Sequence, residues 1–370
     1  MAKNSNLGAA KAAKNDEFYT QYADIQKEVN AYLEYNPDTF RDKTVLLPCD
    51  DPEWSNFTRF FAQNFERLGL KRLISTSYAV ESKKYKDYEP TLFETESPLF
   101  DMDKTRIKGK IFELTRDTNG SGRIDIDDLE WHYLEGDGDF RSPEVCALRD
   151  QADIIVTNPP FSLFREFVAW IMDAEKQFLI IGHQNAITYK EVFPLIQNNK
   201  IWLGRGFSGG ATHFLSPYDD HAVAGDHHEG MIRVSGVHWF TNIDHGRRHE
   251  PMRLMSMQDN LRYGRHRDLR EHGYIQYANY DAIDVPYADS IPDDYDGVMG
   301  VPITWLDKYC PEQFVIIGQT QGDSGKELGL KPFDRELKKL NKSLRDGQLY
   351  YMIDGRPEKP YARILIRKKQ

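Results

Sequence analysis

Short apolar runs alternate with amphipathic helical patterns between residues 43 and 204. The predicted strands cover residues 43–51, 71–79, 153–157, 176–182 and 200–204, and two more lie around a turn within 109–140. The predicted helices cover residues 16–35, 55–69, 162–172 and 189–199. Such alternation is typical of parallel strands joined by crossover helices. The sequence therefore predicts an α/β fold with a doubly wound, mostly parallel sheet.

Two of the predicted helices carry recognisable end signals. Thr20 is a plausible N-cap for the helix within residues 16–35. Gly69 ends the helix at 55–69 as a left-handed C-cap. One side of the latter helix is apolar, and this side comprises Phe57, Phe60, Phe61, Phe65 and Leu68. We expect this side to face the sheet.

The alternating pattern fades after about residue 205, where Gly, His and Arg become frequent. We expect a flexible N-terminus over residues 1–15 and an α/β domain over 16–240, with a charged, irregular insertion at 80–130. Residues 241–370 form a separate C-terminal region in this prediction. A chain of 370 residues is long enough for both parts.

Charge and cysteine content exclude some classes of protein. The 48 basic and 58 acidic residues give a net charge of −10, so a basic surface, if present, is local. No apolar run approaches the roughly 18 residues that a membrane span needs. Cys49, Cys146 and Cys310 form no CxxC pair, which argues against a disulfide framework. We expect a cytoplasmic protein.

A rigid polar segment, Asn158-Pro159-Pro160-Phe161, follows the apolar run at 153–157. Open α/β sheets bind ligands at the carboxyl ends of their strands. The Asn158 side-chain oxygen and the Pro159 carbonyl can accept the two N–H groups of a nucleobase amine, and the prolines hold them rigidly. Phe161 can stack on the base. The alternative is a plain strand-to-helix turn with proline in the first helical turn.

This motif and its neighbours resemble the EcoRI-type adenine-specific DNA methyltransferases. The resemblance rests on "DEFYTQYADI", "CDDPEWSNF", "GDGDFRS", "NPPFSLFREFV" and "DGVMGVPITWLDKYCPEQFVIIG". It implies a class I S-adenosylmethionine-dependent methyltransferase with a C-terminal target-recognition region. The enzyme would methylate N6 of an adenine flipped out of duplex DNA at a specific site, as in restriction-modification systems. Asn158, Pro159, Pro160 and Phe161 would be the catalytic residues.

The same resemblance implies a binding site for the methyl donor. The loop after the first strand contains no glycine, so the backbone would not approach the donor closely and side chains would contact it instead. Asp50 or Asp51 would lie near the methionine amino group. Asp139 would accept from the donor's adenine amine, with Asp137 as the competitor, and Phe140 would stack on the ring. The complete set of expected donor contacts is Phe18, Tyr19, Thr20, Asp50, Asp51, Pro52, Ser55, Asp137, Asp139 and Phe140.

One signal of a donor site is missing. The strand at 71–79 does not end in the acidic residue that usually holds a ribose. Thr76 or Ser77 is the expected substitute.

Residues 117–128 are close to the spacing of an EF-hand loop, with calcium ligands at Asp117, Asn119, Ser121, Asp125 and Asp128. The last position is Asp rather than Glu, and no second copy exists. A β-hairpin with Asn-Gly-Ser-Gly at its tip is the favoured interpretation. A bound calcium would be structural, and no catalytic metal is expected.

Residues 245–274 hold seven arginines against four acidic residues, a pattern suited to phosphate contacts. Its alternative is a solvated, ion-paired helix. Trp239 is a candidate for the target pocket, although core packing explains it equally well. The predicted DNA contacts are Arg247, Arg248, Arg262, Arg265, Arg267 and Trp239.

Three other functions remain open. The substrate could be RNA or a protein glutamine amide, or the chain could be a non-catalytic DNA-binding module. For the favoured function we expect double-stranded DNA as partner, a monomer, a bacterial or phage source and no membrane. A cognate restriction endonuclease would act on the same site without direct contact.

Overall fold

The structure is a computed structural model that describes residues 20–50, 55–79, 95, 97–207, 211–215 and 231–369. Its backbone contacts divide the chain into two compact units, one of residues 1–186 and 203–245 and the other of residues 187–202 and 246–370. The predicted functional division near residue 240 stays a prediction. No helix of the described residues is long and apolar enough to cross a membrane.

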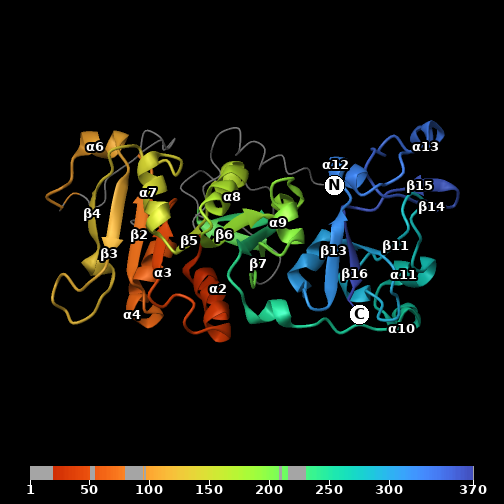
Figure 1. Cartoon of the computed structure of the whole chain (residues 1–370), viewed down its shortest axis with the longest axis horizontal. Helices are drawn as coiled ribbons and strands as arrows, with labels where there is room; N and C mark the ends of the chain where they lie inside the picture. Colours follow the sequence, from red (N-terminus) through yellow and green to blue (C-terminus); the bar gives the residue numbers. More distant parts are fainter. Residues whose placement is uncertain are drawn as a thin grey trace. The chain divides into compact units, whose positions relative to one another are not determined.

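The first unit is built around an eight-stranded mixed sheet (Figure 1). In spatial order its strands are β4 Glu130–Tyr133, β3 Lys110–Leu114, β2 Arg72–Ser77, β1 Thr44–Leu47, β5 Ile154–Thr157, β6 Gln177–His183, β10 Val237–Thr241 and β7 Trp202–Leu203. The four strands β2, β1, β5 and β6 run parallel. Strand β3 runs antiparallel to β2 and β4, and β10 runs antiparallel to β6. The predicted α/β class is therefore confirmed, with a parallel centre and antiparallel flanks.

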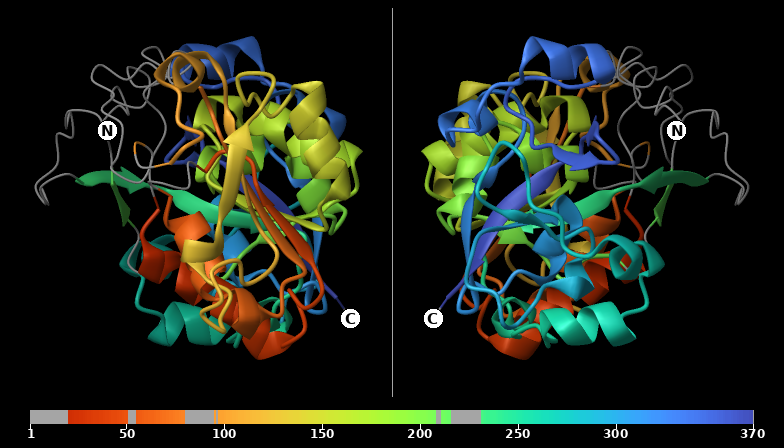
Figure 2. Two further views of the ribbon diagram at one scale, coloured as in Figure 1. Left: turned by 90° about the vertical axis from the view of Figure 1, so that its left-hand side faces the viewer. Right: turned by 90° about the vertical axis from the view of Figure 1, so that its right-hand side faces the viewer.

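Helices cover both faces of the parallel centre. Val45 and Leu47 of β1 belong to the core cluster that also holds the buried apolar residues of α2 (Tyr22–Tyr35) and α3 (Asn56–Gln63). Leu46 points to the opposite face because side chains alternate along a strand. On that face Phe164 of α8 packs on Phe240, with ring centroids 5.0 Å apart. Figure 2 shows the red to red-orange helices α2, α3 and α4 on one side of the sheet and the yellow to green helices α7 and α8 on the other. The helices are α2 Tyr22–Tyr35, α3 Asn56–Gln63, α4 Phe65–Leu68, α7 Pro143–Gln151 and α8 Phe164–Asp173.

Helix ends follow the sequence only in part. Gly69 has φ 64° and caps α4, as predicted. The predicted apolar side of this region is buried, but the helix is interrupted at Asn64. Thr20 is not an N-cap, because α2 begins at Tyr22 after Gln21. The Thr20 side chain instead contacts the loop after β5, as described below.

The described part of the predicted insertion, residues 95 and 97–130, contains regular elements. Helix α6, Met102–Ile107, begins after Asp101, whose side chain accepts from two backbone amides. Strands β3 and β4 pair antiparallel, as the hairpin interpretation of residues 109–140 expects. In the connecting loop, Asp117 accepts from the amides of residues 120–122, and Asp128 accepts from those of 118, 119 and 125.

These bonds bear on the calcium alternative. They stabilise the turn without a cation, since the two carboxylates already bond backbone amides. The described residues contain no group of three or more His, Cys, Asp or Glu that could hold a metal ion.

The second unit contains a four-stranded sheet of β11 Ile283–Asp284, β12 Met299–Pro302, β16 Arg363–Lys368 and β13 Phe314–Gln319. Arg363 and Asp284 form a buried ion pair at 2.8 Å, and Tyr277 donates to the same carboxylate. The pair connects β16 to β11 across the intervening β12, and removing one partner would leave an unpaired buried charge.

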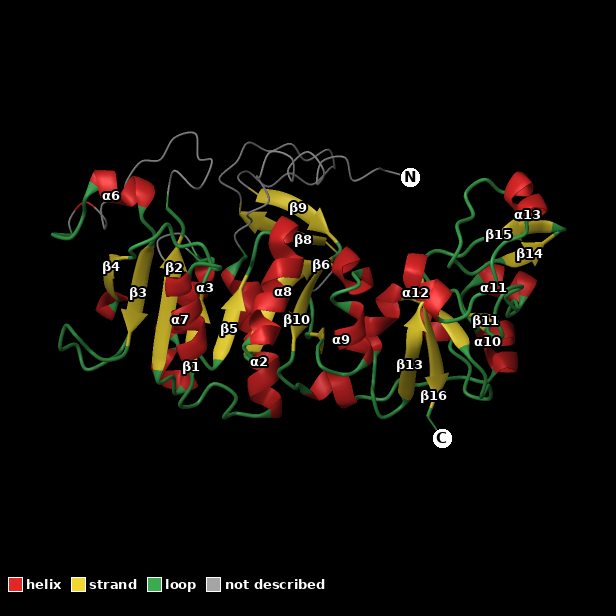
Figure 3. Ribbon diagram, turned by 45° about the horizontal axis from the view of Figure 1, so that its top comes forward, coloured by secondary structure: helices red, strands yellow, loops and turns green. Residues whose placement is uncertain are grey.

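Shorter elements surround this sheet (Figure 3). The helices of the second unit are α9 Phe193–Gln197, α10 Met257–Tyr263, α11 Arg267–His272, α12 Gly322–Glu327 and α13 Arg335–Leu340. Strands β14 Tyr351–Ile353 and β15 Arg356–Glu358 form a hairpin.

In the first unit, β8 Ala211–Leu215 and β9 Met231–Ser235 form a separate two-stranded ribbon. The 3-10 helices are η2 Ile126–Asp128, η3 Phe161–Leu163, η4 Gln184–Thr188, η5 Gly246–His249, η6 Ala288–Ser290 and η7 Ile303–Lys308.

Candidate active site

Asp50 joins the carboxyl ends of β1 and β5. Its carboxylate accepts from the Ser55 hydroxyl at 2.7 Å and from the Thr157 hydroxyl at 2.6 Å. Its carbonyl accepts from the Ser75 hydroxyl of β2 at 2.6 Å. Asp50 is buried, so each bond is shielded from water. The predicted donor residues Asp50 and Ser55 therefore lie together, and Asp50 connects Ser55 to the end of β5.

Asn158 follows β5 and meets the N-terminal segment. Its Nδ2 donates to the Thr20 hydroxyl at 3.4 Å, although the two residues are 138 positions apart. Asn56 of α3 donates to the Thr20 carbonyl at 2.8 Å. The Asn158 contact uses the nitrogen and not the Oδ1 acceptor that the predicted catalytic role requires. The structure thus brings a predicted donor residue against a predicted catalytic residue.

The rest of the motif forms a tight turn into α8. Pro159 is buried, and the Pro160 carbonyl accepts from the Leu163 amide at 2.9 Å. Phe161 is half-buried and packs against the core cluster. A proline pair of this kind restricts the backbone that carries the Pro159 carbonyl.

His183, which the sequence analysis missed, lies beside Phe161. The two ring centroids are 6.5 Å apart. His183 ends β6, and its Nδ1 accepts from the Asn185 amide at 3.2 Å. Burial, with the nearby His238, lowers the pKa of His183 and favours the neutral ring. Its position as the last residue of a central strand is the signal that could have revealed it.

The loop at 137–139 packs on the end of β2. Gly138 has φ 86°, and a Cβ there would collide with the Ser77 carbonyl. The Ala79 amide donates to the Asp137 carbonyl at 2.8 Å. Only glycine combines this φ with so close a backbone approach. The close packing of this loop against β2 therefore requires glycine at position 138.

Thr76 and Ser77, the expected substitutes for the ribose contact, are both buried at the end of β2. Thr76 is fully buried and donates to the Pro48 carbonyl at 3.1 Å. Ser77 is also buried, and its hydroxyl accepts from the Lys110 amide at 3.3 Å. Both hydroxyls thus bond within the sheet region, and the ribose contact stays a prediction. The residue that follows β2 is Tyr78, which sequence reasoning overlooked.

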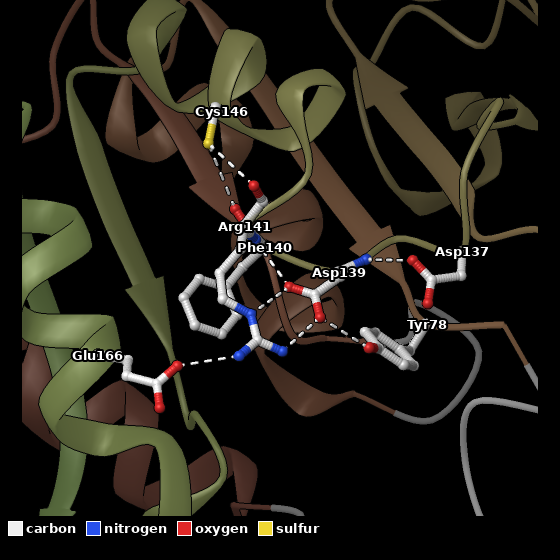
Figure 4. Close-up of polar contacts among 7 residues, drawn as sticks. All are labelled: Tyr78, Asp137, Asp139, Phe140, Arg141, Cys146 and Glu166. Carbon is white, nitrogen blue, oxygen red and sulfur yellow. Dashed lines mark hydrogen bonds and ion pairs between the residues drawn. The ribbon is translucent and has the colours of Figure 1, made fainter.

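Tyr78 and Arg141 surround the carboxylate of Asp139 (Figure 4). The Tyr78 hydroxyl donates to Asp139 at 2.9 Å, and the Arg141 guanidinium binds both carboxylate oxygens, the shorter bond being 2.6 Å. The guanidinium lowers the pKa of Asp139 to about 2, so the group is ionised at neutral pH. Asp137 accepts from the Asp139 amide at 3.1 Å.

Phe140 is more buried than its predicted role suggests. Its exposed fraction is 4%, and its ring contacts Phe167 and Trp170 of α8 at centroid distances of 5.0 and 5.6 Å. The Arg141 guanidinium lies 5.2 Å from the ring centre. Stacking of an adenine on Phe140 stays a prediction.

Four further predicted residues, Phe18, Tyr19, Asp51 and Pro52, lie outside the described residues.

Two of the predicted DNA contacts have other roles. Trp239 is 1% exposed and stacks on Phe207 with a centroid distance of 5.5 Å, so the core-packing alternative is correct. Arg248 lies 3.8 Å from the centre of the Trp202 ring and donates to Asn199 at 3.1 Å. Its guanidinium is therefore engaged by Trp202 and Asn199.

The four other predicted arginines are exposed, namely Arg247, Arg262, Arg265 and Arg267. Arg265 pairs with Asp289 at 2.7 Å and Arg267 with Glu271 at 2.6 Å. Arg262 lies 5.1 Å from the ring centre of Tyr263, which is 65% exposed. Exposed ion pairs are weak, so these side chains can exchange partners for phosphate.

The sequence matches a family model described as "Adenine-specific methyltransferase EcoRI" over residues 6–369. The chain belongs to this family. It is 41% identical over 352 residues to the type II methyltransferase M.EcoRI of Escherichia coli, covering 93% of this chain and 98% of the relative. It is 34% identical to M.MpnI of Mycoplasma pneumoniae, covering 83% of each. No solved structure gives a significant match.

Family membership confirms the predicted enzyme class. The chain is an adenine-specific DNA methyltransferase of the restriction-modification type. The matched residues include both units, so the resemblance is not limited to the α/β sheet.

Proposed function

We propose that the protein transfers the methyl group of S-adenosylmethionine to the N6 amine of an adenine extruded from duplex DNA. The observation that carries this proposal is the placement of Asn158 to Phe161 at the end of β5, beside Thr20 and the Asp50 loop. In a doubly wound fold of class I, donor and target meet at this edge of the sheet. A duplex base is out of reach until it is flipped, at a cost of a few kcal/mol.

The motif supplies what an adenine amine lacks. Its nitrogen is a weak nucleophile because the lone pair is delocalised into the ring. The Asn158 Oδ1 and the Pro159 carbonyl accept the two N–H groups, draw the nitrogen towards a tetrahedral shape and free the lone pair for in-line attack. Phe161 stacks on the base, and Pro160 keeps the turn rigid. These groups stabilise the transition state because they are oriented before the reaction.

The residues around the motif fit the donor by their chemistry. Thr20, Asp50 and Ser55 cluster where a methionine moiety would meet the ends of β1 and β5. Asp139 and Asp137 offer carboxylates for an adenine amine at the end of β2. Phe18, Tyr19, Asp51, Pro52 and Phe140 complete the proposed contacts. When bound, S-adenosylmethionine would supply an electrophilic methyl group: the sulfur–methyl bond breaks as the N6–methyl bond forms, S-adenosylhomocysteine leaves, and one amine proton is lost to solvent.

We propose that residues 241–370 recognise DNA, with Arg247, Arg262, Arg265 and Arg267 as phosphate contacts. We further propose a monomer that shares its recognition site with a cognate endonuclease and does not touch it.

Replacing Arg262 by alanine is expected to weaken binding to duplex DNA. A lost phosphate contact lowers the slope of log K against log salt by about 1 and weakens affinity about equally for all sequences. Titration of labelled duplex at several salt concentrations measures both quantities. Arg67→Ala is the matched control, since Arg67 is an exposed arginine in the last turn of α4, outside the proposed DNA-recognition region. An equal loss in both variants would contradict a specific contact by Arg262.

Transfer of a labelled methyl group tests the proposed substrate. The full chain is incubated with labelled S-adenosylmethionine and with duplex DNA, RNA or protein. We expect label in DNA only, recovered as N6-methyladenine within one short sequence context. Label in RNA or in glutamine would establish one of the alternative substrates. Failure to bind the donor at all would favour a non-catalytic DNA-binding module.

A further inference from the structure

The carboxylate of Asp139 has no unused acceptor position. It receives four hydrogen bonds: two from Arg141 and one from the Arg141 backbone amide, at 2.6 to 2.9 Å, and one from Tyr78 at 2.9 Å. Two bonds go to each oxygen, and an ionised carboxylate has about four lone-pair sites. An adenine amine that bonds to Asp139 must therefore displace one of these donors.

Arg141 is the donor best able to move. Its side chain is 51% exposed, and its second terminal nitrogen already donates to Glu166 at 2.9 Å (Figure 4). Tyr78 has a single hydroxyl hydrogen, which would lose its acceptor on displacement. The backbone amide is held by the turn itself. A guanidinium has five N–H groups, so Arg141 can leave Asp139 and remain bonded to Glu166.

We propose that Arg141 is a positioning residue that competes with the donor's adenine for Asp139 and shifts onto Glu166 when the donor binds. This inference rests on the proposed function, with Asp139 as the adenine acceptor. Glu166 lies in the first turn of α8, the helix that follows the Asn158–Phe161 motif. The movement of Arg141 from Asp139 to Glu166 therefore links the loop at 137–139 to the helix that follows the catalytic turn.

Calorimetric titration of the full chain with S-adenosylmethionine tests the competition. Arg141→Met removes the competing guanidinium and keeps an apolar stem, so donor binding is expected to tighten about threefold. Glu166→Gln removes the charge that receives Arg141, so binding is expected to weaken about threefold. In the Arg141→Met background, Glu166→Gln is expected to leave donor affinity unchanged, because no guanidinium remains for Glu166 to bind.

Arg165→Met is the matched control, because Arg165 is an exposed neighbour on α8 that is not among the four donors to Asp139. Its donor affinity should equal that of the unaltered protein. Weaker binding by Arg141→Met, or a Glu166 effect of equal size in both backgrounds, would overturn the competition. If the unaltered protein did not bind S-adenosylmethionine at all, the proposed function itself would be overturned. Failure of the competition and failure of the proposed function are therefore distinguishable.

Discussion

Replacing Asn158 by alanine is expected to lower the methyl-transfer rate about 100- to 1000-fold while donor affinity changes less than about twofold, in line with the loss of one preorganised polar group at a reacting atom. The variant loses the Oδ1 acceptor for the adenine amine, so the lone pair stays delocalised. The hydrogen bond from Asn158 to Thr20 in the unaltered protein is long, at 3.4 Å, so its loss should destabilise the fold little. Single-turnover transfer to duplex DNA and calorimetry with the donor measure the two quantities.

Asn198→Ala is the control for this experiment. Asn198 is an exposed asparagine that donates to the Pro194 carbonyl in the second unit. It should retain full transfer activity. A normal rate in Asn158→Ala would remove the basis for the proposed role of the motif. A large loss of donor affinity would assign Asn158 to the donor site instead.

Replacing Asp50 by alanine is expected to lower the free energy of unfolding by about 2–4 kcal/mol, because two buried hydroxyls lose a charged acceptor. Ser55 and Thr157 are both buried, so water does not readily replace the carboxylate. The loop after β1 would lose its connection to β5, and donor binding should fall with it. Urea unfolding and donor titration measure the two effects.

Two milder variants separate the contributions of Asp50. Asp50→Asn keeps one accepting oxygen and should lose less stability than alanine. Thr157→Val removes only the bond to β5 and keeps the Ser55 bond. If Asp50→Ala were as stable as the unaltered protein and bound the donor normally, the buried contacts would have no structural role. If Thr157→Val alone abolished donor binding, the β5 connection would be the essential one.

The sequence by itself determined the local elements of the α/β unit. Apolar runs of strand length predicted β1, β2, β5 and β6, because a central strand needs apolar side chains on both faces. The helical spacing of Phe57, Phe60 and Phe61 predicted a buried helix face. The motif at Asn158 was legible for the same reason, since its rigidity comes from adjacent prolines.

Only the tertiary structure decided which side chains meet. Thr20 contacts Asn158 across 138 positions, and Asp50 contacts Thr157 across 107. Trp239 is buried, although its sequence suits a pocket equally well. Hydrogen-bond partners of this kind depend on which strands become neighbours in the sheet, and that order follows from the packing of the whole core. Periodicity reports the environment of each residue along its own element, whereas Thr157 as a partner of Asp50 and Tyr78 as a partner of Asp139 come from elements that lie far apart in the sequence.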